Sequence, residues 1–182
     1  AVLATINALP ASVSTVTNAS KCGSDTMTIS ATASTGMTIN WYTDSTTQTV
    51  LQSGTITGVN KYLTPVLSTT TKYWTLQRNL TTGCVSAARK SVTATVNPRP
   101  TSPSVNSGSR CGTGTVTLTA TAPTNPAGTV AWYAAATGGT TLSTSTSYTT
   151  ASLSTTTNYY VEAKTTATGC VSSSRSVATA TI

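Results

Sequence analysis

The sequence predicts an all-β protein built from two tandem β-sandwich domains, and three observations predict it. The chain repeats itself once, apolar residues alternate with threonine or serine along most of its length, and signals for helices are almost absent. Charged residues make up only 7% of the 182 residues, while Phe and His are absent. Disordered chains combine high net charge with few periodic apolar residues, so the alternation favours a folded protein.

The repeat is clearest in two phrases. LSTTTKYW, from Leu67 to Trp74, returns as LSTTTNYY, from Leu153 to Tyr160, and GCVSAAR, from Gly83 to Arg89, returns as GCVSSSR, from Gly169 to Arg175. Trp-Tyr and Lys/Arg-Cys-Gly also recur, with the small offsets that loop insertions produce. A period of about 90 residues is too long for a solenoid unit of about 20–50 residues and fits one small domain per copy.

A proline-rich junction separates the two copies. We predict a first domain over residues 10–97, a linker over 98–102 and a second domain over 103–182. The junction from Asn97 to Pro103 contains three prolines, which favour an extended, semi-rigid spacer. Residues 1–9 include Ala-Thr-Ile-Asn, which resembles the end of each copy. We therefore expect this segment to be the last strand of a preceding copy or a strand that joins a neighbouring molecule.

About seven strands are expected in each copy. The clearest alternation covers residues 27–33 and 116–122. The other expected strands are 37–43 and 129–134 with the Trp-Tyr pairs, two that start at Tyr62 and Tyr148, 72–78 and 158–164, and two long closing strands, 84–96 and 170–182. With a short strand before each Cys-Gly and one after each Trp, the count is that of an immunoglobulin-like sandwich.

Two tryptophans are predicted to anchor the two cores. Trp41 and Trp132 lie in the middle of apolar strands, so we expect their rings to lie between the sheets and not to bind carbohydrate. Trp74 is ambiguous, because it follows Tyr73 and neighbouring strand residues point to opposite faces. An outward Trp74 is the one aromatic residue that we predict as a contact site.

The second copy resembles a known family. The resemblance rests on CGTGTVTLTA (111–120), Trp-Tyr (132–133), Gly-Gly-Thr (138–140), Ser-Tyr-Thr-Thr (147–150), TNYYVEA (157–163) and Gly-Cys-Val-Ser (169–172). This order is similar to the Ig-like repeats of large Bacteroidota surface proteins, which include gliding-type adhesins exported by the type IX system. The first copy departs from it, with Asp25 and Met27 in its early strand and no Gly-Gly after its Trp-Tyr.

The resemblance implies a function as well as a fold. It implies a non-catalytic spacer or stalk in an adhesin or filament at the extracellular cell surface, whose partners are neighbouring repeats or copies of itself. The alternative is a glycan-binding Ig-like module of a secreted protein, with contact through Trp74 and nearby loops.

Four cysteines fall two per copy at matching positions. The sequence has no CxxC pair and no His, so disulfides in an oxidising exterior fit better than zinc or thioredoxin-like sites. Because each copy holds an even number of cysteines at matching positions, pairing within each copy is favoured, Cys22 with Cys84 and Cys111 with Cys170. The expected strand order opposes it, because the two cysteines of a copy would lie at opposite ends of the sandwich. Pairing of Cys22 with Cys170 across the copies therefore stays open, with Cys84 and Cys111 left for neighbouring copies.

The charged residues argue against several functions. The net charge of +7 comes from ten scattered Lys and Arg residues, so nucleic-acid binding is not expected. No stretch reaches the roughly 18 apolar residues of a membrane helix, so no membrane insertion is expected. The three carboxylates, Asp25, Asp44 and Glu162, do not recur between the copies, and with no His they cannot form a paired-acid site, a Ser-His-Asp triad or a calcium cage. We therefore expect no enzyme, no metal and no cofactor.

Two short patterns indicate modification. Asp25-Thr26-Met27 and Asp44-Ser45-Thr46 resemble the sequon at which Bacteroidota attach O-glycans to exported proteins. Thr26 and Ser45 are therefore predicted glycosylation sites.

Overall fold

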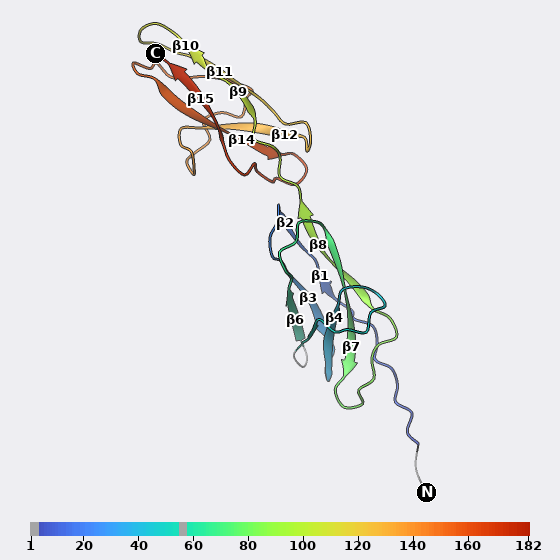
Figure 1. Ribbon diagram of the computed structural model, residues 1–182. Coiled ribbons are helices and arrows are strands. Elements are labelled where there is room, and N and C mark those ends of the chain that lie inside the picture. Colours follow the sequence, from blue (N-terminus) through green and yellow to red (C-terminus); the bar gives the residue numbers. More distant parts are fainter. Residues whose placement is uncertain (1–3, 55–57) are drawn as a thin grey trace. The chain divides into compact units, whose positions relative to one another are not determined.

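The structure is a computed structural model that describes residues 4–54 and 58–182. Every helix or strand in this described part is a β-strand, which confirms the predicted all-β class. The chain divides into two compact units, Ala1–Asn97 and Pro98–Ile182 (Figure 1). Each unit has its own hydrophobic core.

The first unit is a sandwich of two sheets (Figure 1). The smaller sheet has the order β1-β3-β6, and the larger has the order β2-β8-β7-β4-β5. The strands are β1 (Val16–Thr17), β2 (Ala19–Cys22), β3 (Thr28–Ala33), β4 (Met37–Tyr42), β5 (Gln52–Ser53), β6 (Gly58–Leu63), β7 (Thr71–Asn79) and β8 (Lys90–Asn97). Their pairings are antiparallel except that of β2 with β8, which is parallel.

The second unit repeats this arrangement without a counterpart of β5, because the strand expected after Trp132 is reduced to an isolated bridge between Trp132 and Ser143. One sheet has the order β13-β11-β9 and the other β10-β15-β14-β12. The strands are β9 (Ser104–Asn106), β10 (Gly108–Ser109), β11 (Thr117–Thr121), β12 (Gly128–Tyr133), β13 (Ser147–Thr149), β14 (Thr157–Thr165) and β15 (Ser176–Thr181). Here β10 runs parallel to β15, as β2 does to β8.

In each unit the first segment of chain forms two short strands in succession, one in each sheet: β1 then β2, and β9 then β10. A polar side chain between the two strands makes a hydrogen bond to the closing strand. Asn18 lies between β1 and β2, and its Oδ1 accepts a hydrogen bond from the Thr93 N–H at 2.8 Å. Ser107 lies between β9 and β10, and its Oγ accepts one from the Thr179 N–H at 2.9 Å. Each side chain thus satisfies a backbone donor of the closing strand where the ladder is interrupted.

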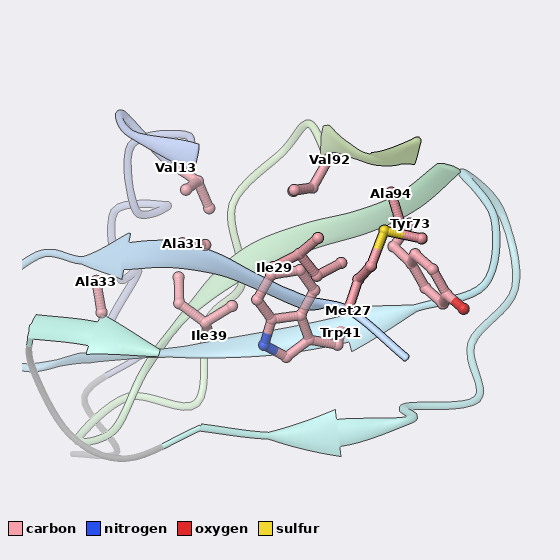
Figure 2. Packing of buried hydrophobic residues seen from close by; sticks show 10 residues of the cluster. All are labelled: Val13, Met27, Ile29, Ala31, Ala33, Ile39, Trp41, Tyr73, Val92 and Ala94. Atoms are coloured by element: carbon pink, nitrogen blue, oxygen red, sulfur yellow. The ribbon is translucent and has the colours of Figure 1, made fainter. Parts of the chain in front are cut away.

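The two cores are built around the predicted tryptophans. Trp41 and Trp132 are fully buried. The Trp41 ring stacks on Tyr62 at 5.6 Å between ring centroids, and the Trp132 ring stacks on Tyr148 at 5.5 Å. Figure 2 shows the first core, whose ten buried members are Val13, Met27, Ile29, Ala31, Ala33, Ile39, Trp41, Tyr73, Val92 and Ala94.

Alternation explains why these residues meet. In β3 the side chains of Ile29, Ala31 and Ala33 point to one face, because successive strand residues point to opposite faces. The intervening Thr and Ser residues of β3 face the other side. The outcome is a core of small aliphatic residues around one large indole, with polar residues on the outer surface.

The closing strands are shorter than predicted. Residues 84–96 and 170–182 were expected as strands, but β8 begins at Lys90 and β15 begins at Ser176. A serine side chain interrupts each ladder. Ser86 Oγ accepts from the Gln77 N–H at 3.3 Å, and Ser172 Oγ accepts from the Ala163 N–H at 3.2 Å. Because the hydroxyl replaces a strand carbonyl, the chain bulges before pairing resumes.

The strands expected to start at Tyr62 and Tyr148 also differ. Tyr62 lies near the end of β6, and Tyr148 is the middle residue of β13. Thr64 and Thr150 follow these strands, and their hydroxyls accept the N–H groups of Met27 and Val116, each at 3.0 Å. Side-chain hydrogen bonds therefore take over where the backbone ladder ends, and the residue pattern alone did not show this.

Candidate functional site

Each unit holds one arginine over the tyrosine of its Trp-Tyr pair, and we call this cluster the arginine clamp. In the first unit the Arg89 Cζ lies 3.6 Å from the centroid of the Tyr42 ring. Its Nη1 donates to the Asp44 carbonyl at 2.9 Å, and its Nη2 donates to the Thr47 carbonyl at 2.5 Å. The clamp thereby ties the loop that follows β4 to the bulge that precedes β8.

The second unit repeats the clamp with different partners. The Arg175 Cζ lies 3.4 Å from the centroid of the Tyr133 ring. Its Nη1 donates to the carbonyls of Ala135 and Gly138, each at 2.8 Å. Its Nε lies 3.4 Å from Glu162 Oε2 on β14, and this ion pair has no counterpart among the described residues of the first unit. The position equivalent to Glu162 in the first unit is Leu76. Leu76 lies opposite Asn40, the residue before Trp41, and Glu162 lies opposite Ala131, the residue before Trp132.

The clamp is the cluster that sequence reasoning missed. The signal was present, since Arg ends both copies of the GCVS phrase and Tyr follows both core tryptophans. What the repeat could not show was that these distant residues lie together. The described structure gives them loop-fixing roles and no reacting group.

Beside the second clamp lies an open cleft of about 440 Å³. The loop Ala136–Gly138 and the segment Ser172–Arg175 form its walls, and Glu162 lines it between them.

Trp74 lies on the outer face of its sheet. Tyr73 is buried in the core, so Trp74 points the other way. It is half-buried and pairs across the strands with Tyr42, the tyrosine of the first clamp. Trp74 therefore presents only part of its ring to solvent.

The cysteines do not pair within the copies. Cys84 and Cys111 have free thiols, whereas Cys22 and Cys170 are disulfide-bonded. The favoured pairs, Cys22–Cys84 and Cys111–Cys170, are therefore wrong for this structure.

The reason lies in the length of each sandwich. In the first unit Cys22 lies opposite Asn97, at the end of β8, in the β2–β8 ladder. The Cys84 carbonyl accepts a backbone hydrogen bond from the Asn79 N–H, before β8 begins. A strand of eight residues at about 3.3 Å each separates the two positions by more than about 25 Å. A disulfide needs Cα atoms within about 7 Å.

The two predicted glycosylation sites differ in accessibility. Ser45 is exposed in a turn, where Asp44 Oδ1 accepts the N–H groups of Thr46 and Thr47 at 2.7 and 2.6 Å. These backbone hydrogen bonds, from Thr47 first, lower the pKa of Asp44 to about 2. Thr26 is half-buried beside Asp25, whose pKa is lowered first by its side-chain bond to Lys21.

The described residues form no cluster suited to metal chemistry. Within residues 4–54 and 58–182, no three His, Cys, Asp or Glu side chains come together as metal ligands. The same residues contain no helix long and apolar enough to cross a membrane.

Comparison with known proteins identifies the repeat. The family described as "Ig-like domain CHU_C associated" matches the chain twice, over residues 10–98 and 100–182. This double match confirms the expected tandem Ig-like domains. No match is found among curated proteins.

Solved structures of tandem β-sandwich domains are also similar. The fibronectin(III)-like modules of Clostridium thermocellum CbhA share 14% identity over 94% of this chain and 92% of that chain, with a TM-score of 0.44. The titin z1z2 domains, solved in complex with telethonin, share 16% identity over 97% and 96%, with a TM-score of 0.41. Chicken CNTN1 FN1-FN3 domains share 12% identity over 92% and 63%, with a TM-score of 0.46.

Proposed function

The chain belongs to the CHU_C-associated family of Ig-like domains, and we propose that it is a non-catalytic structural module of an extracellular bacterial cell-surface adhesin, stalk or filament. One observation supports this proposal above the others. The residues that recur between the two units hold each sandwich together: the core tryptophans, the bulge serines, the clamp arginines and the clamp tyrosines. Domains of this kind are typically non-catalytic, and function is added to them at local sites.

An extracellular location fits the cysteine chemistry. Ig-like domains with a disulfide are typical of oxidising compartments. Treating intact source cells with a membrane-impermeant, lysine-reactive label tests this, because Lys61 and Lys72 are exposed on the first unit. We expect both lysines to be labelled on intact cells. Labelling that requires cell lysis would contradict the proposal.

Neighbouring repeats or copies of the chain are the proposed partners. Residues 4–9 are exposed, and Ile6 is 97% exposed although its neighbours match the end of β8. Within both described units the place of the last strand is already filled, by β8 and by β15. We therefore propose that this segment pairs with a sheet of another Ig-like domain through main-chain hydrogen bonds.

The disulfide is proposed to link the two copies. Because pairing within a copy is excluded by distance, we propose that Cys22 pairs with Cys170 and that Cys84 and Cys111 serve neighbouring copies. Non-reducing peptide mapping tests the pairing. A linked peptide that holds Cys22 and Cys170 is expected, and one that holds Cys22 and Cys84 would exclude it.

O-glycosylation at Thr26 and Ser45 is also proposed. The exposed turn at Ser45 is the more accessible of the two. Native protein should therefore have an intact mass above that of the bare chain, with glycopeptides that contain Ser45. An intact mass equal to that of the bare chain would contradict this.

A further inference from the structure

The open cleft of the second unit has the features of a ligand site, which goes beyond the structural role proposed above. Its volume of about 440 Å³ falls within the roughly 300–1,000 Å³ that small-molecule sites occupy. It lies on the outer face of the sheet, between the loop after β12 and the bulge before β15.

The Glu162 carboxylate keeps unused capacity to accept hydrogen bonds. Its Oε1 lies 3.5 Å from the Tyr133 hydroxyl, and its Oε2 lies 3.4 Å from Arg175 Nε. Both contacts are at the long limit for a hydrogen bond, and a carboxylate can accept about four. The Glu162 side chain is 21% exposed, so a ligand can reach it.

The Arg175 guanidinium keeps unused capacity to donate. The hydrogen bonds of Arg175 to described residues come from Nη1 and Nε. Its Nη2 donates to no described residue. In the first clamp the corresponding Nη2 of Arg89 donates to the Thr47 carbonyl. The second clamp therefore places a spare donor next to a spare acceptor.

The chemistry of this pair selects a neutral ligand. Glu162 disfavours anions and Arg175 disfavours cations, whereas a hydroxyl group can donate to one and accept from the other. Two adjacent hydroxyls on one ring can satisfy both residues at once. Ser173 adds a polar wall.

From this arrangement we propose that the second unit binds a neutral sugar in the cleft beside Glu162 and Arg175. The first unit serves as an internal control. There Leu76 replaces the carboxylate and is 6% exposed, and both terminal nitrogens of Arg89 are engaged. The first unit should therefore not bind the same ligand.

Amide NMR of the full chain tests the proposal. The probes are the methyl glycosides of glucose, galactose, mannose and N-acetylglucosamine, added one at a time. We expect at least one of them to shift the amide signals of Gly138, Glu162 and Ser173 in a saturable manner. The signals of Leu76 and Arg89 should stay unchanged.

Two variants make the test specific. Glu162→Leu copies the residue of the first unit, and it should weaken binding about tenfold or more because a charge-assisted hydrogen bond is lost. Ser173→Ala alters none of the described hydrogen bonds and should fold normally while weakening binding less. Circular dichroism of both variants checks folding. Absence of saturable shifts with all four glycosides, or unchanged binding by a folded Glu162→Leu variant, would overturn the proposal.

Discussion

The two units share one clamp but differ in what lies beside it. In the first unit the Arg89 guanidinium bonds to two loop carbonyls, and Leu76 packs on the same face with 6% exposure. In the second, Glu162 takes the place of Leu76, and an open cleft forms beside Arg175. The repeated arginine therefore fixes a loop in both units, while the equivalent position on the neighbouring strand is an apolar Leu76 in the first unit and the carboxylate of Glu162 in the second.

The largest expected effect comes from the core tryptophans that both units share. Trp132→Ala should lower the free energy of unfolding of the second unit by about 3–5 kcal/mol, because a fully buried indole is removed. Hydrogen exchange measured by mass spectrometry resolves the two units. Peptides of β12 and β14 should lose protection while those of β4 and β7 keep it, and Trp41→Ala should give the reverse pattern. Equal loss in both units with either variant would show that they do not have separate cores.

The clamp arginines should have the next largest effect. Arg89→Ala removes a cation–π contact and two charge-assisted hydrogen bonds, so we expect a loss of about 2–3 kcal/mol in the first unit. Urea unfolding in reducing buffer measures it. Arg89→Lys is the matched control and should restore less than half, because an ammonium cannot span both carbonyls as the planar guanidinium does. Full rescue by lysine would mean that charge alone matters.

The bulge serines should follow with a smaller loss. Ser86→Ala and Ser172→Ala each leave one buried backbone N–H without its acceptor, at a cost of about 1–2 kcal/mol. The two variants should cost nearly the same, since their geometries match. A negligible loss in urea unfolding for either variant would show that the bulge does not depend on the hydroxyl.

The smallest expected effect is a pH dependence confined to the first unit. The pKa of Asp44 is about 2 in the folded state, below its ordinary value of 3.8. A lowered folded-state pKa stabilises the fold above the unfolded pKa, and this stabilisation is lost as the pH falls from about 4 to about 2. Unfolding monitored across this range should show the loss in the wild type and a smaller one in Asp44→Asn. An equal acid loss in the variant would assign the effect to other groups.

Much of this fold follows from local residue patterns. Strict alternation in residues 27–33 predicts β3 almost to its ends, and the repeated Trp-Tyr pairs indicate the two core tryptophans. The objection to disulfides within a copy also came from strand order alone. The first two features depend on the period of side chains along one strand, which the sequence displays directly. The objection to the disulfides depends on the length and order of the strands.

Other features were not predicted, because they depend on side chains that take the place of backbone hydrogen-bond acceptors or that join distant segments of backbone. The hydroxyls of Ser86 and Thr64 stand in for ladder groups, so the alternation continues past the point where pairing stops. The clamp and the cleft depend on contacts between segments far apart in sequence, such as Arg175 with Gly138. A repeated arginine indicates importance to both copies but not which loop it binds.

Electron microscopy of the native protein on its source cells tests whether this chain is a structural module of the cell exterior. With a gold-labelled antibody against the two-unit chain, we expect label on extracellular fibres, stalks or a surface layer. Label confined to the cell interior, with no surface structure that carries the protein, would contradict the assignment of this chain as a structural module of the cell exterior.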